Sequence, residues 1–451
     1  MLSDTICAPA SAPVNSSIAI IRVSGPESYG AACSIFSKSS SIKNRYAAYG
    51  SVMDGDSVVD DVVLVYYSGP ASFTGEDMAE IFCHGNPLVV SRILRLLFRH
   101  GVRAAEPGEF SKRAFLNGRM DLTAAEAINS LINARSEWEI SASLSQMHGS
   151  LRDAVAALRE DLVLLKADVE ANIDFSDQDI EFVSYESALT RVRSVEDSLA
   201  DIRRRCGEGR RASLGLDVIL AGRPNVGKSS LMNLILNEER ALVSDIPGTT
   251  RDLIRETLQI AGIRINLMDT AGIGNPSDDV ERMGIELTRK KISDASVVLM
   301  VIDASSGLTA EDKEIINSIG NKKCLFILNK IDLVGKDFAK SLSAETGYQF
   351  IPVCAKNGAG FAELEDALKK VVSGEFSDCK NSFLADVRVL NILDSAIERM
   401  SGLSELFGRH ELPEIIAFEL DELVAILSEV TGEITRDDVL GSIFSRFCIG
   451  K

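Results

Sequence analysis

The first part of the chain alternates short apolar runs with residues that break secondary structure. The runs SIAIIRVSG, VVDDVVLVYYSGP and DMAEIFCHG have the β-branched content of strands. Glycine, proline and serine lie between them and indicate turns. We therefore predict a small α+β domain over residues 1–118.

The pattern changes to a helical spacing at Leu122. Leu122, Ala125, Ile128 and Ile132 are spaced for one face of a helix. A long helix with one apolar stripe is predicted next, through Leu151, Val155, Leu158, Leu162, Leu165 and Val169. Helical spacing resumes towards the end of the chain, at Leu390, Leu393, Ile397 and Met400 and again at Ile416, Leu420, Leu423 and Leu427.

Between these helical segments, strand and helix patterns alternate. The runs DVILAG, RINLMDTAG, SVVLMVIDAS, KCLFILNKID and FIPVCAK are nearly continuous in apolar residues, as in a parallel sheet that is buried on both faces. We predict a doubly wound α/β domain over residues 213–377, inserted into a discontinuous all-α helical domain of residues 119–212 and 378–451.

The composition agrees with a globular, multidomain chain. Its 451 residues suggest roughly two to four domains. The hydrophobic fraction of 45% and the charged fraction of 25% are ordinary. No window approaches the roughly 18 uninterrupted apolar residues of a membrane helix, and the first residues lack a basic leader pattern. We expect a cytoplasmic protein that is not associated with a membrane.

Cysteine usage and charge argue against several classes of site. The eight cysteines are scattered without a C-x-x-C pair, and there are four histidines, so neither a zinc site nor a disulfide framework is indicated. The formal net charge of −18 argues against a protein that grips nucleic acid by its overall field. If RNA is bound, a local patch or a more basic partner must supply the attraction.

The stretch GRPNVGKSS, residues 222–230, has the context of a phosphate-binding loop, because it follows the strand DVILAG and precedes a helical run. In such a loop, backbone N–H groups surround the phosphates, Lys228 reaches the β and γ oxygens, and the Ser229 hydroxyl binds Mg²⁺. Taken alone, the motif has one alternative interpretation, a glycine-containing turn between strand and helix.

Three further motifs identify the nucleotide. DTAG, residues 269–272, closes an apolar strand where a carboxylate on the Mg²⁺ side and a γ-phosphate-sensing glycine belong. NKID, residues 329–332, closes another strand at the same edge of the sheet. The Asp332 carboxylate can accept both N–H bonds of guanine, whereas adenine would face it with an acceptor, so the nucleotide is predicted to be GTP. CAK, residues 354–356, takes the place of the usual Ser-Ala-Lys loop, with Cys354 in a structural role.

The catalytic arrangement is predicted to differ from that of Ras. Ile273 follows DTAG, so no glutamine is available there to orient the attacking water. Asn225, with carbonyls of residues 244–249, could hold a monovalent cation where other GTPases place an arginine finger. The alternative role for Asn225 is an amide that stabilises its own loop. The stretch VSDIPGTTRD also carries the switch threonine, Thr250.

Taken together, the motifs resemble the MnmE (TrmE) family of tRNA-modification GTPases over essentially the whole chain. The GTPase motifs alone would fit several translation-related GTPases. The resemblance is narrowed by SIAIIRVSG, by SFTGEDMAEIFCHG at residues 72–85, by EPGEFSKRAFLNGRMDLTAAEA at residues 106–127 and by the terminal FCIGK. Two departures stand out: the family usually has a glycine-richer stretch in place of APASAPVNSSIAIIRVSG, and it more often has lysine where Arg119 stands.

The resemblance implies a potassium-stimulated GTPase of the Ras-like P-loop fold, whose G domains meet across the active sites of a homodimer. Glu281 would act as general base through a second water, and a solvated helix carboxylate is its alternative role. The implied ligands are Asn225, Ser244, Ile246 and Thr249 for K⁺, and Ser229 and Thr250 for Mg²⁺. The nucleotide contacts predicted in all are Asn225, Val226, Gly227, Lys228, Ser229, Ser230, Ser244, Thr249, Thr250, Asp269, Thr270, Ala271, Gly272, Asn329, Lys330, Asp332, Cys354, Ala355 and Lys356.

The resemblance also implies a folate site in the N-terminal domain, which would form the constitutive dimer. Arg22, Glu80, Arg119 and Lys451 would bind 5-formyl- or 5,10-methylene-tetrahydrofolate. Glu80 can accept hydrogen bonds from the N–H groups of the pterin, and the cationic side chains can pair with the folate carboxylates. The alternative role for Arg22 is that of a surface cation. The terminal motif would deliver Cys448 to this site, but a catalytic thiolate is less expected because only Lys451, among lysines and histidines, is near in sequence to activate it.

The function that the resemblance implies is tRNA modification. With an MnmG (GidA)-type FAD protein that uses NADH, the homodimer would form a heterotetramer and add an aminomethyl or carboxymethylaminomethyl group to C5 of the wobble uridine of certain tRNAs. The GTP/GDP cycle would gate that chemistry. The main alternative is a GTP-switched ribosome-assembly or RNA-binding factor without modification chemistry, although residues 378–451 read as acidic amphipathic helices rather than a basic RNA-binding module. A folate-dependent aminomethyltransferase with a vestigial GTPase is a third interpretation.

Overall fold

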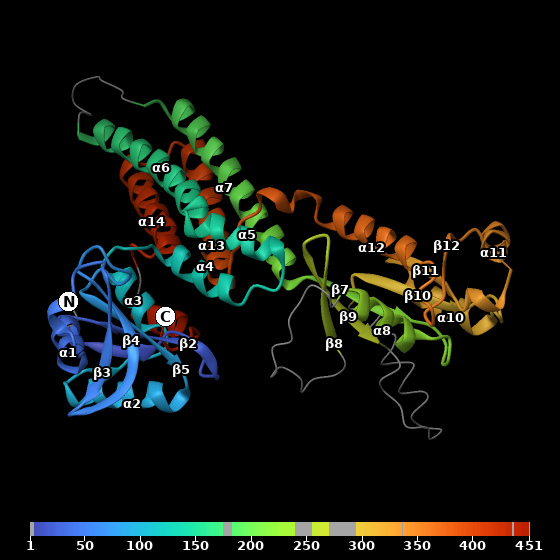
Figure 1. Cartoon of the computed structure of the whole chain (residues 1–451). Helices are drawn as coiled ribbons and strands as arrows, with labels where there is room; N and C mark the ends of the chain where they lie inside the picture. The colour runs from blue at the N-terminus through green and yellow to red at the C-terminus, as the bar shows by residue number, and fades with distance from the viewer. Residues whose placement is uncertain are drawn as a thin grey trace, which may run out of the picture. The chain divides into compact units, whose positions relative to one another are not determined.

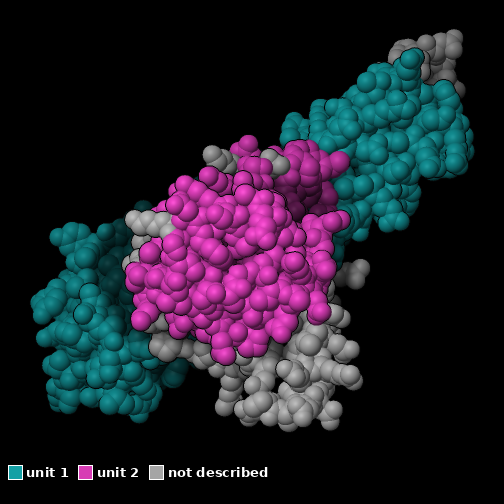
Figure 2. Space-filling view, turned by 90° about the vertical axis from the view of Figure 1, so that its right-hand side faces the viewer, with its two compact units in different colours: residues 1–132, 145–199, 391–451 teal, residues 133–144, 200–390 magenta. Residues whose placement is uncertain are grey.

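The computed structural model describes residues 4–174, 183–239, 255–269, 295–335, 337–434 and 437–450. Its internal contacts divide the chain into two units, which Figure 2 colours separately. Unit 1 comprises residues 1–132, 145–199 and 391–451, and unit 2 comprises residues 133–144 and 200–390. The finer division into domains of residues 1–118, 119–212 with 378–451, and 213–377 stays a prediction.

Unit 1 contains a six-stranded sheet in the order β3-β4-β5-β2-β1-β6 (Figure 1). Neighbouring strands are antiparallel except β1 and β6, which are parallel. The three strand runs predicted from the sequence are confirmed as β2, β4 and β5. The strands are β1 (Ile6–Pro9), β2 (Ser16–Ser24), β3 (Ala47–Asp54), β4 (Ser57–Tyr67), β5 (Met78–Gly85) and β6 (Arg103–Ala104), and the helices among and after them are α1 (Ser28–Ile35), η1 (Ser39–Ser41), α2 (Pro87–Arg99) and α3 (Glu109–Leu116).

Successive residues of β1 point to opposite faces of this sheet, and the two faces have different cores. Cys7 belongs to a large core that includes residues of α1 and α2. Ile6 belongs to a smaller core with Phe110 of α3, against which Phe73 packs. Helix α3 therefore lies against the sheet face opposite to α1 and α2.

The rest of unit 1 is helical. The apolar stripe predicted from Leu151 to Val169 is confirmed, since all of its residues are buried on α6. The stripe from Ile416 to Leu427 is buried on α14, which packs along α6. The boundary between the units falls within α5 (Glu137–Met147), whose residues 137–144 belong to unit 2, and also within α7 and α13. The helices are α4 (Leu122–Ile132), α5 (Glu137–Met147), α6 (Ser150–Asp174), α7 (Tyr185–Leu214), α13 (Val387–Gly408), α14 (Pro413–Thr431) and α15 (Asp437–Phe444).

Unit 2 contains a second six-stranded sheet, in the order β12-β11-β10-β7-β9-β8 (Figure 1). Its neighbours are parallel, as predicted, except for β8, an antiparallel edge strand that pairs with β9. The elements are β7 (Leu216–Ala221), α8 (Lys228–Glu239), β8 (Arg255–Ile260), β9 (Ile263–Asp269), β10 (Val297–Asp303), α10 (Ala310–Ile319), β11 (Lys323–Asn329), η4 (Ile331–Leu333), α11 (Phe338–Thr346), β12 (Phe350–Val353), α12 (Phe361–Glu375) and η5 (Ser377–Asn381).

Both faces of this sheet are covered by helices. Alternate residues of β7 enter two cores, with Leu220 facing α8 and α12 and Ile219 facing α10 and α11. The predicted multidomain fold class, with an N-terminal α+β part, a helical part and a doubly wound P-loop α/β part, is confirmed. Among the residues that the structure describes, no helix has both the length and the apolar character needed to cross a lipid bilayer.

Candidate functional site

The phosphate loop connects the end of β7 to the first residue of α8, as the sequence predicts. Lys228 is buried, and its Nζ donates hydrogen bonds of 2.8 Å to the carbonyl oxygens of both Gly222 and Arg223. Burial lowers the pKa of Lys228, and the nearby carboxylate of Asp269 acts in the opposite direction. Two carbonyls of the loop therefore hold the Lys228 ammonium group inside the loop, where a cation can meet phosphate oxygens.

The predicted magnesium side of the site is assembled from two elements. Ser229, at the start of α8, donates a hydrogen bond of 2.8 Å from its Oγ to Oδ2 of Asp269, the last residue of β9. Asp269 is buried. A hydroxyl and a carboxylate oxygen side by side are hard oxygen donors of the kind that Mg²⁺ prefers, so these residues fit that ion.

Asn329, at the end of β11, joins the phosphate loop to the loop after β12. Its Nδ2 donates to the carbonyl of Val226 at 2.8 Å, and its Oδ1 accepts a bond of 3.0 Å from the backbone N–H of Ala355. Because Asn329 is almost fully buried, these bonds are shielded from water and fix the two loops relative to each other.

Lys330 and Asp332 continue the predicted base-binding side. Lys330 Nζ donates to the carbonyl of Asn225 at 2.8 Å and to Oδ2 of Asp303 at 2.6 Å, and the Asn225 side chain itself is exposed. Asp332 is exposed on η4, where its Oδ1 accepts a bond of 3.1 Å from the buried thiol of Cys354. The thiol thus orients the Asp332 carboxylate, which remains exposed and accessible to a ligand. Ser230, on α8, and Lys356, in the loop after β12, are both exposed.

A second site lies on the sheet of unit 1, where Arg22 of β2 is directly opposite Glu80 of β5. The Nε of Arg22 donates to Oε1 of Glu80 at 2.8 Å, and both side chains are largely buried. The hydroxyl of Tyr67 donates to the other carboxylate oxygen at 3.4 Å, and the guanidinium lies 5.3 Å from the ring centroid of Phe73. Arg22 is therefore part of a packed polar cluster in this structure.

The tail, residues 444–450, is bound beside this cluster. Phe444 and Phe447 are buried against Leu122. Arg22 Nη1 donates to the carbonyl of Gly450 at 3.4 Å, and the backbone N–H of Gly108 donates to the carbonyl of Cys448 at the same distance, 3.4 Å. The thiol-bearing side chain of Cys448 is exposed. The tail is thus held by buried aromatic rings and by backbone bonds.

The comparisons with known proteins agree across the chain. Residues 5–119 match the model of the GTP-binding protein TrmE N-terminus, and residues 122–448 match that of the MnmE helical domain. The chain is 40% identical to the tRNA modification GTPase MnmE of Thermotoga maritima, over 99% of this chain and 100% of the relative. The chain belongs to the MnmE family of tRNA modification GTPases. It is also 42% identical to the MnmE of Aquifex aeolicus, over 97% of each chain. A crystal structure of Aquifex aeolicus Era bound to GDP.AlF4- covers 42% of this chain and 67% of its own, with 27% identity and a TM-score of 0.29.

Part of the site predicted for this MnmE family member lies outside the residues that the structure describes. Nine predicted residues lie outside the described residues, namely Ser244, Ile246, Thr249, Thr250, Thr270, Ala271, Gly272, Glu281 and Lys451. Arg119, which follows α3, is described and exposed. The site roles assigned from the sequence therefore stay predictions, and the described residues supply the geometry from which they can be tested.

Sequence reasoning missed one polar contact of the phosphate loop in this MnmE family member. Arg223 donates from Nε to Oδ1 of Asp312 at 3.0 Å and from Nη2 to Oγ of Ser306 at 2.8 Å. Asp312 is fully buried and also closes a capping box with Thr309 at the start of α10. A threonine three residues before an acidic residue signals such a cap in the sequence, although it does not reveal the arginine partner.

Replacing Gly450 with alanine is expected to loosen the tail. Gly450 has a φ of +95°, and a Cβ there would lie 2.0 Å from the carbonyl oxygen of Pro9. Hydrogen exchange at the Gly108 amide, which donates to the tail, should then accelerate by roughly tenfold or more. Gly441→Ala is the matched control, because a Cβ at Gly441 meets no atom within 4 Å. Equal exchange rates in the two variants would show that Gly450 does not hold the tail.

Proposed function

We propose that this chain is a potassium-activated GTPase that acts in tRNA modification with a one-carbon tetrahydrofolate. The observation that carries the proposal is the presence of two separate built sites in one chain. Unit 2 combines a phosphate loop that holds the Lys228 ammonium group with the Asp332 carboxylate, which accepts a bond from the Cys354 thiol. Unit 1 has a largely buried Arg22–Glu80 pair, and Arg22 donates to the carbonyl of Gly450 in the tail.

In the proposed hydrolysis, each residue of unit 2 has a distinct task. Lys228 binds the β and γ oxygens of GTP, and Ser229 with Asp269 and Thr250 holds Mg²⁺. Asp332 accepts the N–H donors of guanine. Asn225, whose backbone is fixed by Lys330, offers its exposed amide to K⁺ together with Ser244, Ile246 and Thr249. When bound, the two cations supply positive charge next to the β–γ bridge.

Glu281 is proposed as the general base that acts on the attacking water through a second water. Ile273, rather than the glutamine of Ras, follows DTAG in the sequence, so another group must orient the nucleophile. Glu281 follows DTAG in the sequence and matches the family's general base, and it lies outside the described residues.

In unit 1, the charged groups fit a folate. The Glu80 carboxylate offers oxygens to the N–H donors of a pterin, and Arg22 and Arg119, with Lys451, offer donors to its carboxylates. When bound, 5-formyl- or 5,10-methylene-tetrahydrofolate supplies the one-carbon unit. The tail brings the exposed Cys448 to the same region, next to Gly108.

The proposed assembly is a cytoplasmic homodimer that joins an MnmG-type FAD protein in a heterotetramer. Its product would be an aminomethyl or carboxymethylaminomethyl group at C5 of the wobble uridine of certain tRNAs. The net charge of −18 supports a division of labour in which the partner supplies much of the attraction for tRNA.

Steady-state GTP hydrolysis in KCl and in NaCl at equal ionic strength tests the nucleotide part of the proposal. We expect hydrolysis to be at least about tenfold faster in KCl, because the potassium ion replaces an arginine finger. Asn225→Ala should lose this stimulation, and Glu281→Ala should be nearly inactive in both salts. Asn317→Ala, at an exposed asparagine of α10, should behave like the wild type. Equal wild-type rates in the two salts would contradict the potassium site.

A further inference from the structure

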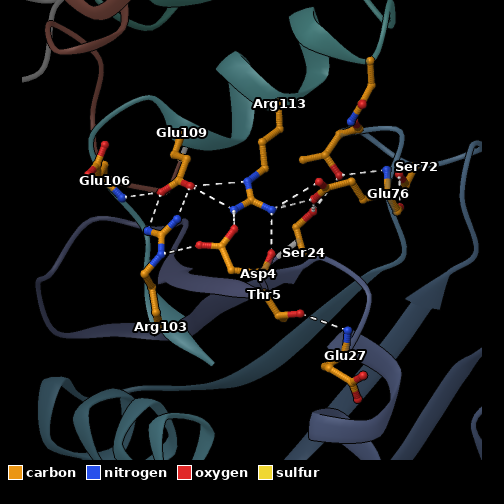
Figure 3. A network of polar contacts seen from close by, with 12 residues as sticks. Asp4, Thr5, Ser24, Glu27, Ser72, Glu76, Arg103, Glu106, Glu109 and Arg113 are labelled. Carbon is orange, nitrogen blue, oxygen red and sulfur yellow. Dashed lines mark hydrogen bonds and ion pairs between the residues drawn. The ribbon is translucent and has the colours of Figure 1, made fainter. Parts of the chain in front are cut away.

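Arg113 of α3 is the centre of a buried ionic network in unit 1 (Figure 3). Its side chain is 1% exposed and makes ion pairs with three carboxylates. Asp4 Oδ1 is 2.8 Å from Nη2, Glu109 Oε1 is 2.9 Å from Nη2, and Glu76 Oε2 is 3.1 Å from Nη1. The three carboxylates come from the entry to β1, from α3 itself and from the loop before β5, so one guanidinium joins three segments.

The network is fully paired around this arginine. Arg103 bridges Asp4 and Glu109 from the solvent side, with bonds of 2.7 Å and 2.6 Å. Burial alone would lower the pKa of Arg113, but its bonds to Glu109 and Glu76 outweigh that effect and hold the pKa above its ordinary value. A buried cation of this kind stays charged, and removing one of its partners has a large cost.

Glu76 is the partner that reaches into the loop of residues 72–77. Its Oε2 accepts a bond of 2.8 Å from Ser24 Oγ, which also lies 2.7 Å from Thr74 Oγ1. Within the loop, Ser72 Oγ donates to the carbonyl of Glu76 at 2.5 Å. Asn117 Nδ2 also donates to the carbonyl of Thr74 at 2.7 Å. Arg113 and Ser24 of β2 therefore hold this short loop at Glu76.

The same loop touches both arginines of the proposed folate site. Phe73 packs in the small core with Ile6 and lies below the guanidinium of Arg22 at 5.3 Å from ring centroid to Cζ. Gly75 lies against Arg119, since a Cβ on Gly75 would be 3.1 Å from Arg119 Cγ. Fixing the loop therefore fixes the surfaces on which Arg22 and Arg119 rest.

We propose that Glu76, clamped by Arg113, is a positioning residue for reduced folate: it holds the 72–77 loop so that Phe73 and Gly75 set the directions of Arg22 and Arg119. The inference rests on the proposed function, because it takes the Arg22–Glu80 cluster as the folate site. The clamp lies behind the loop and does not itself contact the ligand. Its effect is transmitted through the loop backbone, which is why a small displacement should weaken binding.

Asp4 provides a matched control for Glu76. Both carboxylates pair with Arg113, and a change of either to the amide removes one negative charge from the same guanidinium. Only Glu76 belongs to the loop, whereas Asp4 connects Arg113 to Arg103 and to the entry of β1. A purely structural role for the network predicts similar consequences for Glu76→Gln and Asp4→Asn.

Calorimetric titration of the full chain with 5-formyl-tetrahydrofolate tests the inference, with thermal unfolding measured in parallel. We expect both variants to lower Tm, but only Glu76→Gln to raise the Kd for folate, by roughly tenfold or more. Phe73→Ala, which removes the ring below Arg22 without touching Arg113, should raise Kd to a similar extent. This variant keeps the test decisive even if Glu76→Gln does not fold.

The outcomes separate the inference from the function on which it rests. Wild-type protein that gives no heat at millimolar folate would contradict the proposed function and, with it, the ligand assumed here. Wild-type binding with equal Kd values in Glu76→Gln and Asp4→Asn would overturn only the positioning role of Glu76. Wild-type binding with no change in Phe73→Ala would overturn the route through the loop.

Discussion

Lys228→Ala is expected to lower kcat for GTP hydrolysis by roughly 10²–10³-fold. Its ammonium group is buried in the phosphate loop and is held by two backbone carbonyls. During phosphoryl transfer, negative charge develops between the β and γ phosphates, and this ammonium is the cation of the loop that can meet it. Alanine removes the cation that would stabilise this negative charge. The transition state is therefore less stabilised, and kcat falls. Steady-state hydrolysis at saturating GTP measures it.

Lys313→Ala is the matched control for this prediction. Lys313 is exposed on α10 in the same unit, and its removal should change kcat by no more than about twofold. Circular dichroism would verify that both variants fold, because Lys228 also bridges Gly222 and Arg223. A folded Lys228→Ala variant that hydrolyses GTP at nearly the wild-type rate would rule out its proposed contact with the phosphates.

Asp332→Asn is expected to change which base the protein accepts. Guanine presents two N–H donors, and the carboxylate can accept both, whereas asparagine faces one of them with its own N–H₂ group. The loss of two charge-assisted bonds should lower kcat/KM for GTP on the order of 10²–10⁴-fold. Xanthine has a carbonyl where guanine has its amino group, so the variant should gain activity with xanthosine triphosphate. Parallel kinetics with the two nucleotides measure the switch.

Asparagine is a near-isosteric replacement in this environment. It retains an oxygen that can accept the bond which Cys354 Sγ gives to Asp332 Oδ1, so the loop geometry should persist. Asp337→Asn is the control, since Asp337 precedes α11 without a side-chain capping bond. If Asp332→Asn and Asp337→Asn both kept the wild-type preference for GTP, Asp332 would not be the residue that reads the base.

The elements that were predicted from the sequence are those with a strong local pattern. The buried stripe of α6 repeats with a period of 3.6 residues, and the strands of unit 2 are nearly continuous apolar runs. Both patterns can be recognised without knowing which elements pack against them. Strand β8, RETLQI, was not predicted, because an edge strand alternates polar and apolar residues over a short length. Local pattern therefore identifies buried elements better than edge elements.

Long-range contacts set the other limit. Residues 133–144, in the predicted helical domain, group with unit 2. Trp138 donates from its indole N–H to the carbonyl of Cys379 at 3.0 Å and from its backbone N–H to that of Gly262 at 3.1 Å. The bond between Trp138 and Cys379 joins residues 241 positions apart, and no periodic pattern in the sequence predicts it. The grouping could be found only from the folded chain.

The nucleotide site of unit 2 was predictable from the sequence, whereas the Arg113 network of unit 1 was not. Lys228, Asn329 and Asp332 could be predicted because parallel strands end at one edge of a sheet, so motifs after those strands must meet. Arg113 could not be, because two of its partners lie 109 and 37 residues away and nothing in their sequence context pairs them. Motifs reveal the groups that contact a ligand, while the groups that position them depend on tertiary structure.

The tail also gives the chain an order of events during its synthesis. Arg22 and Gly450 are separated by 428 residues, so the ribosome makes the second of these partners roughly 20–90 s after the first. The sheet of unit 1 and the phosphate loop can form while the tail is still untranslated. A product of premature termination before residue 444 would lack Phe444, Phe447 and the contact at Arg22. The contact at Arg22 therefore forms only after residues 444–450 have been made, late in the folding of unit 1.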